Sequence, residues 1–134
     1  SLPRNLRDEY ILSNSYHKYN YVAFTGAFNQ ISNVKVAHTS GTLGTGISLK
    51  GKTTNTYATP ATSALGSATD MTSPTTISSG LSVKLGTSDP TYATNNTLSS
   101  AGYTAFIITQ VQTTSSATAG DSGTATLTLQ YDEN

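Results

Sequence analysis

The sequence predicts an all-β protein, a single antiparallel β-sandwich for which a jelly-roll topology is one option. Apolar residues alternate with polar ones in several short segments, most clearly over residues 122–131. There, one face of a strand carries Ala125, Leu127, Leu129 and Tyr131. Clusters of Gly, Ser, Thr, Asn and Pro separate these segments, as turns separate the strands of a sandwich. We therefore expect the last strand to close the domain with its four apolar side chains against the core.

The composition is that of one small domain with few charges. The chain has 134 residues, enough for one core, and it has no cysteine, which excludes disulfides and thiolate metal sites. Charged residues make up 10% of the chain, against roughly a quarter in an average domain. Ser and Thr together make up roughly a third of the residues. Solubility therefore depends on hydroxyl groups more than on charge.

The formal charges divide unevenly along the chain. Residues 1–52 hold six basic and two acidic residues, a net charge of +4, and residues 53–134 hold one basic and five acidic residues, a net charge of −4. This division either has no role or registers copies of the protein against each other. The basic residues form no Arg-rich run, so no nucleic-acid partner is expected. No apolar run reaches the ~20 residues that cross a bilayer, so no membrane partner is expected.

Residues 1–15 differ from the rest of the chain, and we expect them to form an N-terminal arm or a short helix outside a sandwich domain over residues 16–134. Leu2, Leu6 and Tyr10 recur at every fourth position, as in an amphipathic helix. The segment also concentrates charged residues beside these apolar ones. Such a segment either docks on a neighbouring molecule or plugs its own sandwich.

Half of the eight tyrosines lie between positions 10 and 21. Tyrosine is enriched at protein interfaces because its large ring has a polar tip and little rotamer entropy. In a strand, Tyr19 and Tyr21 share one face, while Val22 and Phe24 share the other. A strand that is apolar on both faces is central in a packed structure or covered by a partner. Stacking of the tyrosines on sugar rings is the alternative use.

Four further strands are expected before the last one. They span residues 31–37, 47–52, 77–85 and 103–111. In the first, Val34 and Val36 share a face that His38 continues, and in the third Lys84 points away from the apolar face. The fourth is apolar on both faces, so we expect it in the middle of a sheet, with the C-terminal strand as an antiparallel partner.

Residues 53–74 are the least patterned part of the chain. Thr, Ser, Ala and Gly dominate there, with Tyr57, Leu65 and Met71 as isolated apolar residues. A loop of about twenty residues is unusual in a compact domain, and it is usually functional, a compact Ω-loop or covered by another chain. We expect such a loop here, with at most weak strands inside it.

One tetrapeptide resembles a catalytic motif. Residues 120–123, Gly-Asp-Ser-Gly, match the core of the nucleophile motif of chymotrypsin-like proteases, and His38 and Ser122 follow that family's chain order. Asp70 or Asp89 would supply the carboxylate. Only twelve residues follow Ser122, too few for the strands that form the substrate pocket, so the segment is better explained as a turn. The two histidines lack a metal-like spacing. We expect no enzyme activity, cofactor or metal.

Two segments resemble those of a known class of proteins. Residues 117–132, ATAGDSGTATLTLQYD, form a Gly/Ser/Thr turn followed by a Thr-alternating strand and an acidic tail, and residues 1–10, SLPRNLRDEY, form an amphipathic opening. In both respects the chain is similar to small virion proteins of tailed bacteriophages, in particular capsid decoration or cement proteins.

The resemblance implies a non-enzymatic structural protein on the capsid surface of the virion. Such a protein binds the assembled lattice of major capsid protein, and copies of itself, as a homo-oligomer or across capsomer seams, and it stabilises the lattice by mass action. We expect the contact residues to be Leu2, Arg4, Leu6, Arg7, Tyr10, Ile11, Tyr16, Tyr19 and Tyr21. Arg4 and Arg7 would pair with acidic groups on a neighbour. Alternatives are a phage tail, neck or fibre component, or an extracellular cell-surface adhesin or carbohydrate-binding module.

Overall fold

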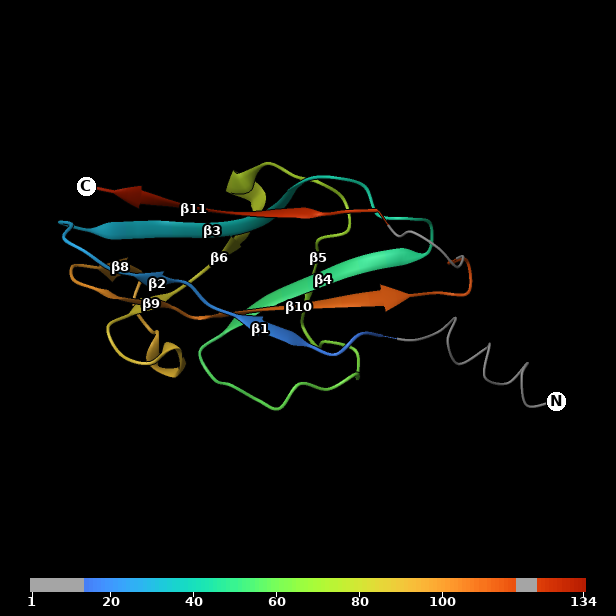
Figure 1. The fold of residues 1–134 in the computed structure, drawn as a ribbon, viewed down its shortest axis with the longest axis horizontal. Helices are drawn as coiled ribbons and strands as arrows, with labels where there is room; N and C mark the ends of the chain where they lie inside the picture. Colours follow the sequence, from blue (N-terminus) through green and yellow to red (C-terminus); the bar gives the residue numbers. More distant parts are fainter. Residues whose placement is uncertain (1–13, 118–122) are drawn as a thin grey trace.

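The computed structural model describes residues 14–117 and 123–134, and nearly all of its regular structure is β (Figure 1). This confirms the predicted all-β class. The strands are β1 (Lys18–Asn20), β2 (Ala23–Phe24), β3 (Ile31–Ser40), β4 (Ile47–Thr54), β5 (Thr69–Asp70), β6 (Leu81–Ser82), β7 (Leu85–Gly86), β8 (Thr97–Leu98), β9 (Gly102–Thr104), β10 (Phe106–Thr113) and β11 (Thr126–Glu133). Two 3₁₀ helices, η1 (Ile77–Ser79) and η2 (Pro90–Tyr92), join them. Within the described ranges no helix is long and apolar enough to span a bilayer.

Two antiparallel layers form the sandwich (Figure 1). In one layer β10 lies between β1 and β4, and β5 pairs with the other side of β4. In the second layer β3 lies between β11 and β6, and β8 also pairs with β3. A smaller sheet, in the order β2-β9-β7, continues the first layer because β9 runs into β10 with only Ala105 between them.

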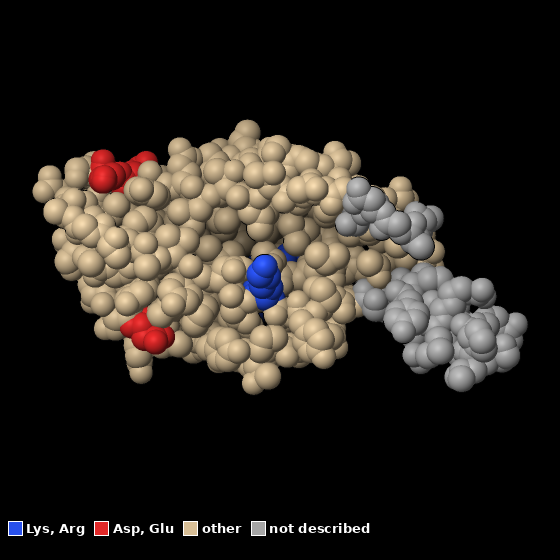
Figure 2. All heavy atoms as spheres, viewed as in Figure 1, with Lys and Arg blue, Asp and Glu red and all other residues tan. Residues whose placement is uncertain are grey.

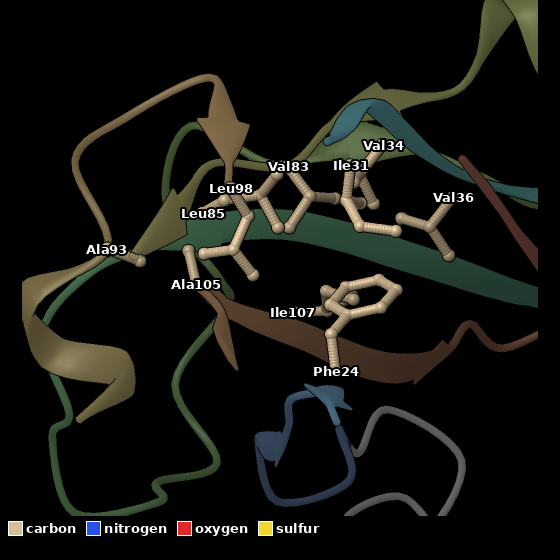
Figure 3. Packing of buried hydrophobic residues seen from close by; sticks show 10 residues of the cluster. All are labelled: Phe24, Ile31, Val34, Val36, Val83, Leu85, Ala93, Leu98, Ala105 and Ile107. Carbon is tan, nitrogen blue, oxygen red and sulfur yellow. The ribbon is translucent and has the colours of Figure 1, made fainter. Parts of the chain in front are cut away.

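The core lies between the layers and around the smaller sheet (Figure 3). It consists of Phe24, Ile31, Val34, Val36, Val83, Leu85, Ala93, Leu98, Ala105 and Ile107. Val34 and Val36 are buried and His38 is buried after them, as their alternation predicted. Burial of each large apolar side chain stabilises the fold by about 1.5–3 kcal/mol relative to its exposure to water.

The predicted central strand is confirmed, but its predicted partner is wrong. β10 has neighbours on both sides, and its residues from Phe106 to Ile108 are buried on both faces. The C-terminal strand β11 pairs with β3 in the other layer. The physical reason is that β1 and β4 already occupy both edges of β10, so no edge remains for β11.

Residues 77–85 do not form one strand. They form η1 and then two short strands, β6 and β7, because the chain changes partners: β6 pairs with β3, and β7 pairs with β9. At Gly80 the chain passes so close to β3 that a Cβ would lie 2.3 Å from the carbonyl oxygen of Val36. The predicted faces are confirmed, since Val83 and Leu85 are buried and Lys84 is exposed.

The apolar face of the last strand is buried less than predicted. Leu127 is 41% exposed and Tyr131 is 43% exposed. Leu129 packs against the core, and the ring of Tyr131 meets that of Phe24 edge-on at 4.9 Å. The reason is that β11 lies at the edge of its layer and, among the described strands, pairs only with β3.

Two further expectations have mixed outcomes. The tyrosine-rich strand is split into β1 and β2 at residues 21–22, and the weak strand expected within residues 53–74 is β5. The expected arm or helix over residues 1–15 lies outside the described residues except for Asn14 and Ser15, which contact the end of β10.

Candidate binding surface

Five aromatic side chains gather on the outer face of the β1–β10 layer. Phe106 lies at their centre, with ring centroids 5.6 Å from Tyr19, 5.9 Å from Tyr21 and 5.9 Å from Tyr57. Tyr19 also meets Tyr57 at 4.9 Å, and Tyr21 meets Tyr103 at 5.9 Å. All five distances fall in the range that favours edge-on or tilted aromatic pairs. We call these five residues the tyrosine patch.

The position of the tyrosine patch follows from the alternation of side chains between the two faces of β10. Ile107 faces the core, so Phe106 and Ile108 face outward. β1 lies antiparallel to β10 with Tyr19 opposite Ile108, which brings the Tyr19 ring beside Phe106. Phe106 is only 8% exposed, whereas Tyr21 is 50% and Tyr57 is 57% exposed. The patch therefore has a buried apolar base with polar-tipped rings in water, as interface tyrosines have.

The loop over residues 55–68 is fixed to this outer face by one buried side chain, Gln110. Its Nε2 donates to the carbonyl oxygens of Ser63 at 2.9 Å and Ser15 at 3.0 Å. Its Oε1 accepts from the backbone N–H of Leu65 at 2.9 Å. A buried amide with these partners fixes three segments relative to one another. The long loop is thus covered by its own sheet, and it holds Tyr57 in the tyrosine patch.

Two other side chains hold the same loop. The His17 Nε2 lies 2.8 Å from the Ser63 carbonyl oxygen, and the His17 backbone N–H donates to the Ala61 carbonyl at 2.9 Å. The ammonium of Lys52 donates to the Gly66 carbonyl at 3.0 Å. Between the loop and the sheet remains a hollow of about 430 Å³, which Tyr19 helps to line.

A second hollow of about 400 Å³ opens where β4 ends. Its walls come from the end of β4, the β6–β7 link, the segment after η2, and the residue between β9 and β10. The lining residues are Thr53, Thr54, Asn55, Ser82, Val83, Lys84, Ala93, Thr94, Asn96 and Ala105. We call it the Lys84 hollow. Thr54 lines both hollows, so the two meet at the end of β4 beside the tyrosine patch.

Charged groups are sparse on the molecule. On the face shown in Figure 2, acidic atoms lie towards the end that holds the C-terminus, and basic atoms lie near the middle. Among the described residues one ion pair forms, with the Lys50 ammonium 3.7 Å from an Asp70 carboxylate oxygen. Hydrogen bonds from the hydroxyl and the backbone N–H of Thr72, and then the Lys50 charge, hold the pKa of Asp70 below its ordinary value. The carboxylate is exposed, so the effect on stability is small.

His38, the histidine of the protease-like motif, is buried among backbone carbonyl groups. The Nδ1 of His38 is 2.8 Å from the Met71 carbonyl oxygen, and its Nε2 is 2.8 Å from the Ser40 carbonyl and 3.1 Å from the Gly41 carbonyl. The ring is buried, and each of its two nitrogens lies within hydrogen-bond distance of a backbone carbonyl oxygen. Ser122 lies outside the described residues. Within the described ranges no three His, Cys, Asp or Glu side chains gather as a metal site would require.

The predicted contact residues divide into two groups. Tyr19 and Tyr21 lie together in the tyrosine patch. Tyr16 is exposed and takes part in none of the ring pairs formed by the described aromatic residues. The other predicted contacts, all near the N-terminus, lie outside the described residues: Leu2, Arg4, Leu6, Arg7, Tyr10 and Ile11.

The sequence did not point to three members of the patch: Tyr57, Tyr103 and Phe106. One pattern could have found Phe106, because a strand that is apolar on both faces needs a cover on its second face. Tyr57 lies in an unpatterned loop, so the position of its ring depends on the tertiary contacts that hold this loop, among them the hydrogen bonds of Gln110.

No family model matches this chain, and comparison with curated proteins and with solved structures finds no match either. The tyrosine patch and the two hollows are therefore the features from which a function can be argued.

Proposed function

We propose that this chain is a non-enzymatic structural protein that docks on an assembled protein lattice through its tyrosine patch, as a decoration protein docks on a phage capsid. The observation that carries the proposal is the patch itself, in which Tyr21 and Tyr57 are half exposed around a buried Phe106. Rigid aromatic side chains with polar tips give contact area at little entropic cost. A protein partner is therefore the natural occupant of this surface.

The first described residues pair with β10, which belongs to the layer that carries the tyrosine patch. The backbone N–H of Ser15 donates to the Val111 carbonyl at 2.8 Å, and Asn14 forms a β-bridge with Gln112. Asn14 and Ser15, which follow Arg4 and Arg7 in the sequence, thus join the layer that carries the patch. On this proposal, the N-terminal segment and the patch bind neighbouring major capsid subunits or copies of this chain on the virion surface.

The mechanism is mass action. A decoration protein that binds only the assembled lattice stabilises it by RT ln(1 + [L]/Kd), where [L] is the concentration of unbound decoration protein. It leaves the unassembled subunits unchanged. A surface rich in hydroxyl groups and poor in charge suits a protein that packs beside many copies of the same neighbour.

Co-sedimentation with candidate capsids tests the proposal. We expect the purified protein to sediment with assembled capsids at a fixed stoichiometry, and the double variant Tyr21→Ser/Tyr57→Ser to lose most of this binding. The matched control is Tyr92→Ser, because Tyr92 is 68% exposed but lies outside the patch. Equal binding by the patch variant and the control would refute docking through the patch. Binding to isolated tails in place of capsids would favour a tail, neck or fibre component.

A carbohydrate-binding module is the second candidate, favoured by one observation. Tyr19 of the tyrosine patch lines the hollow under the loop, and Thr54 lines both this hollow and the Lys84 hollow. Aromatic rings beside hydroxyl and amide groups are the usual components of sugar sites. A glycan array with the wild type and the Tyr21→Ser/Tyr57→Ser variant separates the candidates, because only a sugar site at the tyrosine patch predicts a glycan whose binding this variant loses.

A further inference from the structure

The Lys84 hollow has rigid walls. The backbone N–H of Ala105 donates to the Lys84 carbonyl at 2.8 Å, and the N–H of Val83 donates to the Val34 carbonyl at 3.0 Å. On the other side, Leu85 and Asn95 exchange both backbone hydrogen bonds, at 2.7 and 2.9 Å. The segments that bound the hollow are therefore held in place without a ligand. A volume of about 400 Å³ lies in the usual range of preformed small-molecule sites.

The lining combines an apolar floor with a hydroxylated rim. Val83, Ala93 and Ala105 are buried members of the core and form the floor. The rim offers the hydroxyl groups of three threonines and one serine and the amides of two asparagines. Hydroxyl and amide groups both donate and accept hydrogen bonds. A ligand that matches this lining carries several hydroxyl groups and one less polar face, which describes a pyranose ring.

A positive charge in the lining indicates that the ligand is an acidic sugar and not a neutral sugar. Among the described residues, Lys84 is the only charged one that lines the hollow, and its ammonium forms no ion pair with a described acidic residue. A carboxylate on the ligand would form a charge-assisted hydrogen bond with it, about twice as strong as a neutral one. A single lysine matches one negative charge better than the two of a phosphate monoester.

From these observations we propose that the Lys84 hollow binds a sugar unit that carries one carboxylate. The site is separate from lattice docking, because none of its lining residues belongs to the tyrosine patch. It provides this chain with a second binding activity, towards acidic saccharides, whichever partner the tyrosine patch has.

NMR titration with matched methyl glycosides tests the proposal. The probes are the gluco, galacto and manno hexuronides with the neutral hexosides of the same configuration, and the methyl glycoside of N-acetylneuraminic acid. We expect at least one acidic sugar to shift the backbone amides of Ser82, Lys84, Thr94 and Asn96 and to bind about tenfold more tightly than a neutral counterpart. No binding by any acidic sugar, or equal binding by each acid and its neutral counterpart, would overturn the proposal.

Two pairs of variants locate the site. Lys84→Gln should reduce binding of the acidic sugar to the level of the neutral one, while Lys18→Gln, which changes an exposed lysine on β1, should not. Asn96→Asp adds a negative charge to the rim and should weaken binding. Asn95→Asp adds the same charge at a residue that does not line the hollow and should weaken binding less. Equal effects within either pair, or equally tight binding of inorganic phosphate, would contradict the assignment.

Two further measurements are needed. The first distinguishes a surface glycan from a free sugar as the source of the ligand, and the second distinguishes the sugar site from lattice docking. Immobilised oligouronates, with the free methyl glycoside as competitor, show whether the hollow takes the end of a surface glycan or only a free sugar. Lys84→Gln should leave co-sedimentation with capsids unchanged. Loss of lattice binding by this variant would show that the hollow belongs to the protein interface and is not a sugar site.

Discussion

The side-chain Nε2 of Gln110 donates a hydrogen bond to the carbonyl oxygen of Ser63 over 2.9 Å, although 47 positions separate the two residues. Gln110 is buried on β10, and Ser63 lies in the long loop that follows β4. The bond, together with the one from Leu65 to Gln110, fixes the loop on the outer face of the sheet. Tyr57 therefore stays beside Phe106, and the tyrosine patch is complete.

Gln110→Ala tests this relationship. The variant removes the acceptor of the Leu65 N–H, while the Ser63 carbonyl keeps its contact with His17. An unsatisfied buried polar group costs about 1–3 kcal/mol. We expect the free energy of unfolding to fall by that amount and the Leu65 amide to exchange its hydrogen faster. Chemical denaturation and native-state hydrogen exchange measure the two effects. If Leu65 kept its protection in the variant, the loop would not depend on Gln110.

His38→Leu tests the buried histidine. Carbonyl oxygens only accept hydrogen bonds, so a ring N–H of His38 is the donor in its contacts with these backbone oxygens. The substitution removes the hydrogen bonding of this buried ring to the surrounding carbonyl oxygens, and we expect a loss of about 2 kcal/mol or more in the free energy of unfolding. His17→Leu is the control, because its ring contact is exposed and should cost less than about 1 kcal/mol. Equal losses in the two variants would show that His38 only fills space.

The lowered pKa of Asp70 predicts how stability depends on pH. Because the folded-state pKa lies below the ordinary value of 3.8, Asp70 stabilises the fold at pH values above 3.8. That contribution is lost as pH falls through the lowered pKa. The wild type should therefore exceed Asp70→Asn in stability at pH 6, and the difference should vanish in strong acid. Urea denaturation from pH 6 to pH 2 measures it.

Two physical causes lower the pKa of Asp70, and variants of the neighbouring residues can separate them. The hydrogen bonds from Thr72 lower its pKa more than the charge of Lys50 does. We expect Thr72→Val to raise the pKa of Asp70 more than Lys50→Gln does, although only the second variant removes a charge. Carboxyl titration by NMR gives both values. A larger shift in the Lys50 variant would mean that the ion pair is the main cause.

Gly41→Ala tests how the last strand is placed. At Gly41 φ is +97°, and an added Cβ would lie 1.9 Å from the carbonyl oxygen of Thr124, two residues before β11. Backbone strain and overpacking together should cost about 2–4 kcal/mol. Gly66→Ala is the control, because open space surrounds that position and φ is not positive there, so its stability should stay the same or rise slightly. Thermal unfolding of both variants decides between these outcomes.

The class of the fold and the faces of its main strands could be predicted from the order of the residues alone. Alternation over β3 predicted that Val34, Val36 and His38 are buried, and alternation before β7 predicted that Lys84 is exposed. The two apolar faces of β10 predicted its central position. These predictions succeed because successive side chains of a strand point to opposite faces, so a few neighbouring residues decide which face is apolar.

The pairing of the strands and the position of the binding surface could not be predicted from the sequence and depend on the three-dimensional packing of the chain. β11 pairs with β3 because both edges of β10 are occupied, and residues 77–85 divide because β6 and β7 have different partners. Tyr57 joins the tyrosine patch, and Lys84 lines its hollow, through contacts between segments far apart in the chain. Such contacts depend on the free edges and the register of the sheets, which no local pattern of residues records.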